Sequence, residues 1–421
     1  MKIAIIGSGI AGLSCAWKLA ERADVQLFEA AATPGGHTAT VDIALDGTHW
    51  AIDTGFIVFN DRTYPHFLSL LAELGIESQK TEMSFSVRNH RSGLEYNGHS
   101  LSSLFAQRSN LFRPQFLRFI AEILRFNKRG KQWLQQQNRD ETLNDFLISQ
   151  GFSQFFAQHY ILPMGAAIWS TSLAEMRNMP LSLFLHFFNH HGLLDVVNRP
   201  QWYVIPGGSR EYVRRLLNLI GDKLQLHLNS PVVSAARDEQ GVTLQTAAGS
   251  QRFDQVIFAC HCDQTLQMLQ DASAEERAML SGVPYSANEV VLHTDTQLLP
   301  HNRRAWASWN YHLDDGADGD ERAGASVTYN MNMLQGITAP HTFCVTLNPT
   351  RPIDSSKVLA RYNYYHPQFG AQSLAAQQQR LLLNGQRRSW FCGAWSYNGF
   401  HEDGIRSALD VVAAMETAAL L

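Results

Sequence analysis

The stretch that decides the fold is Lys2-Ile3-Ala4-Ile5-Ile6-Gly7-Ser8-Gly9-Ile10-Ala11-Gly12. Its apolar first half predicts a short buried parallel strand, and the residues from 10 to 21 predict a helix. Gly7 permits the tight turn between them, Gly9 lets the backbone approach a pyrophosphate, and Gly12 lets helix and strand pack closely. Phosphates would lie at the helix N-terminus, where free N–H groups and the helix dipole favour negative charge. The stretch therefore predicts a dinucleotide-binding βαβ unit.

The second strand of this unit is predicted at residues 25–28, and Glu29 ends it. A carboxylate about 20 residues after the glycine motif is placed to accept hydrogen bonds from a ribose. The alternative is a glycine turn in an unrelated α/β protein, with Glu29 solvated. Because strand, glycines, helix and acid occur together and in order, we favour dinucleotide binding.

Length, charge and cysteine content restrict the class of protein. A chain of 421 residues is too long for one small core, so we expect two domains. A formal charge of −4 argues against nucleic acid as the main partner. Cys260 and Cys262 flank His261, but no second cluster completes a metal site, and we expect no metal. No leader precedes the first strand and no run of about 18 apolar residues occurs, so we expect a cytoplasmic protein.

A second group of motifs distinguishes FAD from NAD. Pro34-Gly35-Gly36-His37-Thr38 follows Glu29 closely, and Ile52-Asp53-Thr54-Gly55-Phe56 comes next. Here the chain resembles the FAD-binding half of the flavin amine oxidase, phytoene desaturase and protoporphyrinogen oxidase superfamily, in which a Gly-Gly pair after the acidic residue lies against the cofactor. Many members carry Arg directly after the pair. This chain has His37, so an imidazole takes the place of that guanidinium.

Further motifs of the superfamily follow in the same order across almost the whole chain. They resemble, in turn, a Pro-x-Gly-Gly turn before a helix, a strand whose valine backbone contacts the adenine side, a later strand of the nucleotide domain, and the C-terminal flavin motif. The corresponding stretches are Val204-Ile205-Pro206-Gly207-Gly208, Pro231-Val232-Val233, Phe253 to Ala259, Phe391-Cys392-Gly393-Ala394 and Glu402-Asp403-Gly404-Ile405.

The resemblance implies specific contacts at the C-terminal motif. It places Gly393 near the pyrophosphate and the ribityl chain. It also implies that Gly404 and Ile405 begin a helix whose N–H groups face the pyrimidine ring of the flavin, where a helix N-terminus stabilises negative charge. An NAD-only protein conflicts with the Gly-Gly pair and with this motif.

The resemblance is closest to one bacterial branch, the predicted NAD/FAD-binding amine-oxidase-like proteins. That branch is often associated with cyclopropane fatty-acid synthase-like enzymes, which implies a lipid or fatty-acyl substrate. The strings that carry this resemblance are Gly35-Gly36-His37-Thr38, Asp53 to Asn60, Leu162 to Ser170 and Gly399 to Gly404.

FAD is therefore the expected cofactor, bound by residues from the start, the middle and the end of the chain. The expected cofactor-binding residues are Gly7, Gly9, Ile10, Ala11, Gly12, Glu29, Gly35, Gly36, His37, Thr38, Gly55, Phe56, Val232, Val233, Gly393, Asp403, Gly404 and Ile405.

The expected fold class is α/β, with a doubly wound FAD-binding domain and an inserted α+β substrate domain. Nucleotide-type signals at the start, middle and end of the chain indicate that the first domain is assembled from separated segments. We expect it to comprise residues 1–80, 204–285 and 385–421. The substrate or cap domain would comprise residues 81–203 and 286–384, with the pocket between the two.

The catalytic groups are less well determined by the sequence. Many amine oxidases of the superfamily use a Lys near the flavin, but no Lys occurs between Lys223 and Lys357. The missing Lys lowers amine oxidation relative to C–C dehydrogenation. Amine oxidation stays an alternative, because hydride transfer to the flavin is the chemistry of the cofactor and needs mainly positioning. Trp395, Tyr397 and His401 are candidates for the wall of the substrate face, with His401 as a proton carrier. The alternative is aromatic packing under the cofactor.

Three further segments have a functional and a structural interpretation each. The basic, amphipathic stretch from Asn110 to Lys131 suits an anionic membrane surface, but we favour a cap-domain helix with a solvated basic face. The apolar stretch Leu181 to His191 suits a substrate channel, but we favour core. Four acidic residues, Asp314, Asp315, Asp318 and Asp320, are close enough in sequence to suggest a metal cluster, but we favour a solvated acidic loop.

We therefore expect an FAD-dependent oxidoreductase that takes a hydride from a hydrophobic substrate, with C–C dehydrogenation favoured. The alternatives are an amine oxidase, a flavin-dependent double-bond isomerase and a non-catalytic flavin-binding protein. The electron acceptor and the oligomeric state are not determined by the sequence. Peripheral membrane contact is the alternative to a purely cytoplasmic location.

Overall fold

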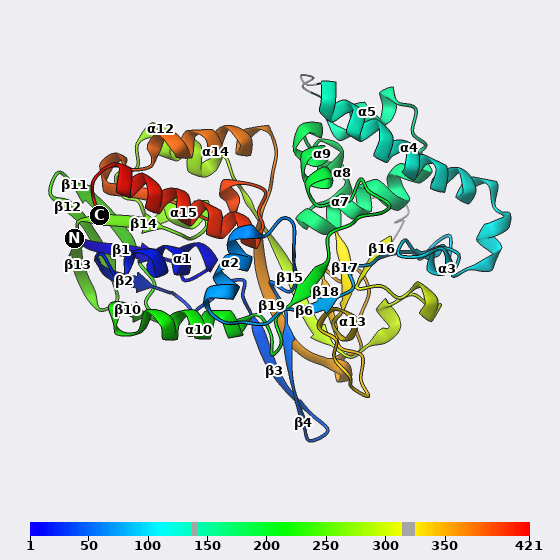
Figure 1. Cartoon of the computed structure of the whole chain (residues 1–421), viewed down its shortest axis with the longest axis horizontal. Coiled ribbons are helices and arrows are strands. Elements are labelled where there is room, and N and C mark those ends of the chain that lie inside the picture. The colour runs from blue at the N-terminus through cyan, green and yellow to red at the C-terminus, as the bar shows by residue number, and fades with distance from the viewer. Residues whose placement is uncertain (137–140, 314–324) are drawn as a thin grey trace.

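A computed structural model describes residues 1–136, 141–313 and 325–421 of the chain. The molecule is elongated, with one α/β unit at the end that holds both termini and a second unit at the other end (Figure 1). The acidic residues considered above, Asp314, Asp315, Asp318 and Asp320, lie outside the described residues.

A five-stranded parallel sheet forms the first unit. Its order is β10-β2-β1-β14-β20, with β1 at its centre. The strands are β1 (Lys2–Ile6), β2 (Asp24–Phe28), β10 (Leu224–His227), β14 (Gln255–Phe258) and β20 (Ser389–Phe391). Strand β1 is apolar on both faces because both faces are covered, as a parallel sheet requires. This confirms the α/β, doubly wound fold class.

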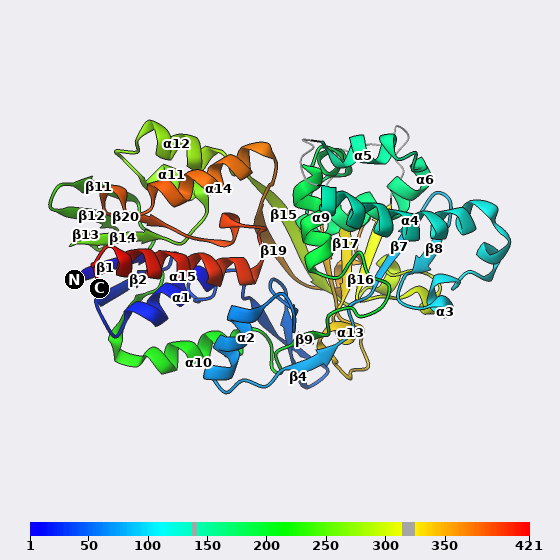
Figure 2. The same ribbon diagram turned by 45° about the horizontal axis from the view of Figure 1, so that its top comes forward.

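Each face of the parallel sheet has its own core. Ile3 and Ile5 face a core shared with α1 (Ile10–Leu19), α10 (Arg210–Ile220) and α15 (His401–Thr417). Ala4 and Ile6 face the opposite core, which includes residues of a small antiparallel sheet and of α11, α12 and α14. Figure 2 shows α12 and α14 above the strands and α10 below them. The elements of the second core are β11 (Ser234–Asp238), β12 (Gly241–Thr246), β13 (Gly249–Phe253), α11 (Cys262–Met268), α12 (Ala274–Ser281) and α14 (Ala371–Leu383).

A seven-stranded mixed sheet forms the second unit, in the order β19-β15-β18-β17-β16-β7-β8. All neighbours are antiparallel except β16 and β7, which are parallel. The strands are β7 (Phe85–Asn89), β8 (Glu95–Asn97), β15 (Tyr285–His293), β16 (Trp309–Leu313), β17 (Ser326–Asn330), β18 (Cys344–Leu347) and β19 (Val358–Pro367).

A Phe-rich group of helices covers part of this sheet. Their buried aromatic side chains share one core with Val87, Tyr311 and Val327 of the strands. Residues 157–161 form a π-helical turn within the group. The helices are α3 (Leu101–Leu104), α4 (Pro114–Gln136), α5 (Leu143–Ser149), α6 (Gln154–Phe156), α7 (Leu162–Trp169), α8 (Leu173–Arg177) and α9 (Leu181–His190).

Smaller elements and two long strands join the units. Strands β15 and β19 run from the middle of the molecule into the second sheet (Figure 1). The hairpin of β3 and β4 shares a core with β15 and β18 through Ile43 and Ile52. The remaining elements are α2 (Pro65–Glu73), α13 (Met331–Gln335), β3 (Thr40–Leu45), β4 (Thr48–Asp53), and the three-stranded sheet of β5 (Phe59–Asn60), β9 (Trp202–Val204) and β6 (Gln79–Thr81).

Helix α14 lies with the first unit, although it falls inside the range 286–384 that the sequence assigns to the substrate domain. It packs against α12 and contacts β20. Its Ala376 and Leu383 are buried in the second core of the parallel sheet. Within the described residues, no helix combines the length and the apolar character needed to cross a membrane.

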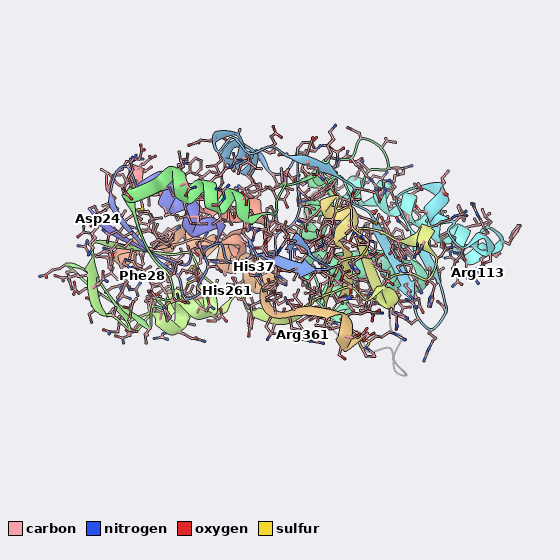
Figure 3. The ribbon with its side chains drawn as sticks, turned by 90° about the horizontal axis from the view of Figure 1, so that it is seen from below. Asp24, Phe28, His37, Arg113, His261 and Arg361 are labelled. Atoms are coloured by element: carbon pink, nitrogen blue, oxygen red, sulfur yellow. The ribbon has the colours of Figure 1, made fainter. Side chains whose placement is uncertain are left out.

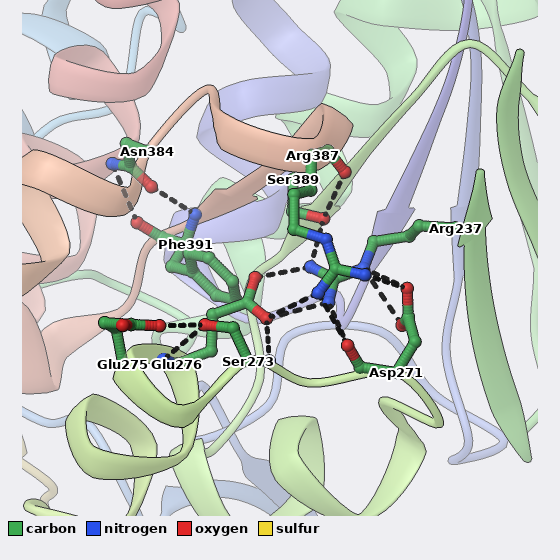
Figure 4. A network of polar contacts seen from close by, with 9 residues as sticks. All are labelled: Arg237, Asp271, Ser273, Glu275, Glu276, Asn384, Arg387, Ser389 and Phe391. Atoms are coloured by element: carbon green, nitrogen blue, oxygen red, sulfur yellow. Dashed lines mark hydrogen bonds and ion pairs between the residues drawn. The ribbon is translucent and has the colours of Figure 1, made fainter. Parts of the chain in front are cut away.

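A buried ion pair fastens the layer of β11–β13 to the parallel sheet (Figure 4). The side chains of Arg237 on β11 and Glu276 on α12 are 1% and 2% exposed, and Arg237 Nη2 donates to Glu276 Oε2 over 2.7 Å. Arg237 also donates to Ser389 Oγ on β20 over 3.0 Å. Glu276 accepts from the backbone N–H of Ser273, the N-cap residue of α12. Three elements therefore meet at one guanidinium.

Removing one partner of this pair is expected to destabilise the fold. Glu276→Gln leaves the buried charge of Arg237 without its main partner, so the free energy of unfolding should fall by about 3–5 kcal/mol. Urea denaturation at pH 7 measures this. The control is Glu275→Gln, which changes an exposed neighbour on the same helical turn and should leave the free energy of unfolding close to that of the wild type. Equal losses in both variants would contradict the assignment.

The same pair predicts a pH dependence. Burial is the largest single influence and acts to raise the pKa of Glu276. The hydrogen bonds from Arg237 and from the backbone of Ser273, together with the positive charges of Arg237 and Arg387, outweigh it, so the net pKa lies below its ordinary value of 4.5. A lowered folded-state pKa means that the stabilisation is present above the unfolded-state value and is lost as the pH falls through the folded-state value. The difference between the wild type and Glu276→Gln should therefore shrink below about pH 4.5.

Candidate cofactor and substrate site

One large cavity lies beyond the carboxyl ends of β1, β2 and β14, and residues of both units line it. Its volume is about 1060 Å³. This exceeds the range of about 300–1,000 Å³ typical of ligand pockets, so the cavity has room for more than one ligand group. In open α/β sheets, this edge is where ligands bind.

The glycine loop after β1 forms one wall of the cavity. A Cβ on Gly12 would lie 1.9 Å from the carbonyl oxygen of Gly7, so only glycine lets α1 approach the loop. Gly7 itself has φ +102° and packs against the carbonyl of Ala259 at the end of β14. A Cβ on Gly9, in contrast, would meet no atom within 4 Å. Gly7 and Gly12 are required by the fold, whereas Gly9 faces open space.

Glu29 holds the glycine loop in place. One carboxylate oxygen accepts hydrogen bonds from the backbone N–H of Ser8 over 2.9 Å and from its hydroxyl over 2.6 Å. The other oxygen accepts from the backbone N–H of Ala31 over 2.8 Å. Glu29 is half-buried and lines the cavity. Since a carboxylate has about four acceptor positions, capacity remains for a ligand hydroxyl.

The Gly-Gly pair lies directly against the first loop. A Cβ on Gly36 would come within 3.1 Å of Gly9 Cα, and Gly36 has φ +58°. Gly35 donates its N–H to the carbonyl of Ser8 over 3.1 Å. Gly55 packs on the backbone of His37, where a Cβ would lie 2.1 Å from the carbonyl oxygen. Three consecutive glycine motifs therefore form one continuous cavity wall.

His37 is a neutral imidazole rather than a replacement cation. Burial and the nearby His366 and His261 lower its pKa to about 3. The ring centroid of His37 lies 5.4 Å from that of His366 and 6.2 Å from that of His261. Figure 3 shows His37 and His261 near the middle of the long axis. The positive charge that many relatives place after the Gly-Gly pair is absent from this residue at neutral pH.

His401 also lines the cavity and is also neutral. Burial lowers its pKa to about 3. Its ring stacks on Phe56 with centroids 3.7 Å apart, and its Nε2 shares a 2.9 Å hydrogen bond with the hydroxyl of Tyr212. That hydroxyl in turn shares a 2.7 Å hydrogen bond with Thr38 Oγ1. Thr38 therefore positions His401 through Tyr212 and does not itself line the cavity.

The C-terminal motif differs from the expected arrangement in one respect. The helix was expected to begin at Gly404, but α15 begins at His401, so Gly404 and Ile405 lie inside its first turns. The reason is that Asp403 caps the helix by accepting the N–H of Phe400 over 2.9 Å and of Asn398 over 3.2 Å. The free N–H groups at the helix start are therefore those of residues 401–403.

Gly404 has a packing contact that explains its small size. A Cβ there would lie 2.5 Å from Ile10 Cγ2, so glycine lets α15 approach the start of α1. Ile405 is fully buried in the core of the first unit. Asp403, Gly404 and Ile405 are not among the residues that line the cavity.

The structure brings most of the expected residues together. Gly12, Thr38 and residues 403–405 lie behind the cavity wall. Those that line the cavity are Gly7, Gly9, Ile10, Ala11, Glu29, Gly35, Gly36, His37, Gly55, Phe56, Val232, Val233 and Gly393. Residues 231–233 were expected to be a strand, but β11 begins only at Ser234, and this stretch is irregular where it meets the cavity.

The three candidate catalytic residues lie in different places. Trp395 and His401 line the cavity. Tyr397 is not among the lining residues, and its hydroxyl donates to Asp410 Oδ2 over 2.6 Å. The guanidinium of Arg406 lies 3.9 Å from the centroid of the Tyr397 ring. Tyr397 therefore contacts the ion pair of α15 with Arg380 rather than the cavity.

The part of the cavity inside the second unit is aromatic and aliphatic. Among the described lining residues there is no lysine, and Arg199 is the one arginine. The helices and strands contribute side chains that sequence reasoning did not assign to a site, because their separate segments meet only when the mixed sheet forms. Examples are Phe85, Tyr160, Met164, Ile168, Trp169, Trp309, Tyr329, Val345, Tyr364 and Phe369. In the stretch Leu181 to His191, for which a substrate channel was the alternative to core, Phe187 and His191 line the cavity and most other apolar residues are in the core. Met164, Ile168 and Trp169 belong to the string Leu162 to Ser170, which at the level of the sequence supported only the family resemblance.

Two further histidines of the cavity were also missed. His261 follows β14 and stacks on Tyr285 with centroids 4.2 Å apart. His366, near the end of β19, accepts a hydrogen bond at Nδ1 from Asn288 over 3.1 Å. Burial lowers the pKa of His366 to about 4 and also lowers the pKa of His261. The cavity is therefore rich in uncharged imidazoles.

Residues of the first unit fit a bound dinucleotide. The open space next to Gly9 leaves room for a pyrophosphate at the N-terminus of α1. His37 Nε2 and Trp395 Nε1 are buried polar atoms without a hydrogen-bond partner among the described residues. Both residues line the cavity, and buried polar atoms are normally satisfied. The parallel sheet, this loop and the second unit over the cavity define a two-domain dinucleotide-binding protein of the flavoprotein type.

The sequence matches the family model of the flavin-containing amine oxidoreductases over residues 10–347. The chain therefore belongs to this family, and it is an FAD-dependent oxidoreductase. No curated protein sequence matches the chain.

Solved structures with the same fold carry different activities. Cyclohexylamine oxidase from Brevibacterium oxydans IH-35A is 16% identical, with a TM-score of 0.70 over 100% of this chain and 99% of that one. The fatty acid isomerase from P. acnes that produces CLA is 14% identical, with a TM-score of 0.68 over 98% of both chains. An oxidoreductase from Methanosarcina mazei is 14% identical, with a TM-score of 0.64 over 99% of this chain and 100% of that one. At these identities the likeness shows the fold alone.

The glycine contacts predict effects of different size for two nearby substitutions. Gly12→Ala forces a methyl group against the Gly7 carbonyl, so the free energy of unfolding of the FAD-free protein should fall by about 3 kcal/mol or more. Gly9→Ala places its methyl group in open space at an N-cap position and should cost about 1 kcal/mol or less. Urea denaturation of both variants measures this. Equal destabilisation would contradict the close approach at Gly12.

Proposed function

We propose that this FAD-dependent oxidoreductase takes a hydride from a hydrophobic, lipid or fatty-acyl substrate, with C–C dehydrogenation as the favoured reaction. The observation that carries the proposal is the wall of the cavity in the second unit. Aromatic and aliphatic side chains dominate it, and lysine is absent from the described lining residues. A wall of this kind stabilises an apolar chain by excluding water, and its described residues include no carboxylate that could pair with an ammonium group.

We also propose roles for the chain's own residues toward the cofactor. The loop at Gly9 and the N-terminus of α1 bind the pyrophosphate, and Glu29 accepts hydrogen bonds from the adenosine ribose. Val232 and Val233 cover the adenine side, and Gly36 with His37 lies against the flavin end. Bound FAD supplies the hydride acceptor for the reaction. His401, held between Phe56 and Tyr212, closes the cavity wall at the start of α15.

The domain division that we propose separates the residues that bind the cofactor from those that bind the substrate. Residues 1–80, 204–285 and 385–421 hold the cofactor, and α14 is added to them because it packs on α12. Residues 81–203 and the strands between 286 and 367 hold the substrate. The cavity between them receives the reacting carbon atoms.

A second candidate is flavin-dependent isomerisation of a double bond in a fatty-acyl chain. The same apolar wall would accommodate such a substrate, and one protein with this fold is a fatty acid isomerase. In that reaction the hydride leaves and returns, so no electron acceptor is consumed.

The cofactor roles predict a change in FAD affinity for Glu29→Ala. Losing a charge-assisted hydrogen bond should cost about 1.5–3 kcal/mol, which is about a ten- to 150-fold higher Kd for FAD. Titration of the FAD-free protein, followed by flavin fluorescence, measures it.

The matched controls for this experiment are Ser8→Ala and Glu21→Ala. Ser8→Ala removes the hydroxyl bond to Glu29 but keeps its carboxylate, and Glu21 is an exposed acid that pairs with Lys223. Both should change the Kd less than threefold. If Ser8→Ala reproduced the full loss, Glu29 would act only as a support for the loop.

The substrate class is tested by anaerobic reduction of the purified yellow protein. A panel of fatty acids, fatty-acyl esters and amines of matched chain length is added, and the visible absorption of the flavin is followed. We expect bleaching by the lipids, because their apolar chains fill the cavity and they bring no ammonium group that would need a carboxylate in this part of the described lining. Bleaching by amines alone would overturn the proposal. A lipid whose double bond moves without consumption of an acceptor would establish the isomerase, and no reduction by any compound would indicate a non-catalytic flavoprotein.

A further inference from the structure

The end of the molecule farthest from the parallel sheet exposes large apolar side chains. They lie on the 3₁₀ turn η1 (Arg108–Phe112) and on α4, and together with the nearby cations we call them the η1–α4 surface. Phe112 is 86% exposed, and Leu111, Leu117 and Leu124 are 42%, 47% and 53% exposed. A solvated basic face, as favoured from the sequence, does not account for these side chains.

The core does not need these exposed residues. Helix α4 buries Phe116, Phe119 and Phe126 in the core of the second unit, which is the helical spacing of one inward face. Leu117 and Leu124 lie seven residues apart, so they share one face of the helix. That face differs from the face that carries Phe116, Phe119 and Phe126. The helix is therefore apolar on two faces, and the second face is exposed in the described part of the structure.

The charge of the segment is strongly positive. Residues 98–136 contain seven Lys or Arg residues and one acid, Glu122, a net charge of +6 in a chain whose total is −4. Glu122 is buried and lies within 3.6 Å of Arg118 and Arg125. Arg108, Arg113 and Lys128 are exposed and form no ion pair with any described residue. Unpaired cations therefore flank the exposed apolar side chains.

The position of the surface leaves it open. Figure 3 shows Arg113 at the extreme end of the long axis, far from His37 at the cavity. Figure 1 shows η1 and the first turns of α4 projecting beyond the strands of the second sheet. The projection can thus meet a flat partner without contact from the first unit.

Charge complementarity selects the partner. A second copy of this chain would bring like charges together, and nucleic acid would not bury the apolar side chains. Cations interspersed with exposed Phe and Leu on a helix are typical of a segment that lies in a membrane interface. We propose that the η1–α4 surface binds an anionic lipid bilayer, with Leu111 and Phe112 inserted between headgroups and α4 along the interface.

This inference is independent of the reaction proposed above. It concerns where the enzyme is held and not what it oxidises, so it stands if the substrate is an amine. The membrane would be bound reversibly, because four apolar side chains and a few cations bind far more weakly than a spanning helix.

Flotation of the FAD-bound protein with vesicles tests the proposal. We expect binding to vesicles of phosphatidylglycerol and phosphatidylcholine, little binding to phosphatidylcholine alone, and weaker binding as salt is raised. The double substitution L111S/F112S should lower the partition coefficient at least tenfold, because two apolar side chains leave the interface. R113Q with K128Q should lower it about 25-fold, at about fivefold per cation.

A matched control keeps the test specific. Leu381 and Leu382 on α14 are 62% and 73% exposed but lie on the first unit, away from the proposed surface. L381S/L382S should bind vesicles as the wild type does, with circular dichroism showing that every variant is folded. Absence of binding to anionic vesicles overturns the proposal, as does equal loss in L381S/L382S. A concentration-dependent dimer abolished by L111S/F112S, without vesicle binding, would assign the surface to a second copy instead.

Discussion

The close approach of α1 to the loop after β1 is the constraint on which the rest of the first unit depends. A Cβ at Gly12 would lie 1.9 Å from the Gly7 carbonyl, so the helix reaches the strand only because no side chain separates them. That approach aims the helix N-terminus at the cavity. The lack of a side chain has the same effect at Gly404, where it lets α15 approach Ile10. Two helices are thus fixed against one loop, and the cavity takes its shape from all three.

The electrostatics of the cavity follow from burial. Among the described residues that line the cavity, Glu29 is the one acid and Arg199 is the one arginine. His37, His366 and His401 are neutral because their pKa values are about 3 to 4. A neutral wall does not compete for a charged substrate group, but it provides imidazole nitrogens that can accept or donate hydrogen bonds. Negative charge brought by a ligand would be balanced chiefly by backbone N–H groups and the dipole of α1.

Local patterns in the sequence predicted the parts of the fold that local physics determines. The βαβ start, the acid after β2 and the turn before α10 depend on glycines and apolar runs within about 30 residues. The start of α15 was wrong by three residues because it depends on a side-chain cap, Asp403 to Phe400 and Asn398, that apolar periodicity does not report. The wall of the cavity escaped prediction for a different reason, which is that it is formed by segments far apart in the sequence. Strand β7 pairs with β16 more than 200 residues away, and His37 meets His366 across a still longer separation.

The positions of the cavity and of the η1–α4 surface are connected through one short stretch of chain. Gly98 and His99 are exposed residues of the cavity lining, and they lead directly into α3, where Leu101 is 76% exposed. A substrate with a long apolar chain partitions into a bilayer rather than into water, since burial of each CH₂ group contributes about 0.8 kcal/mol. An enzyme held on that bilayer would meet such a substrate at its high local concentration, and the chain could enter beside α3 with little exposure to water. Under the two proposals taken together, the apolar cavity and the η1–α4 surface would serve one purpose, which is to keep the substrate out of water between the membrane and the flavin.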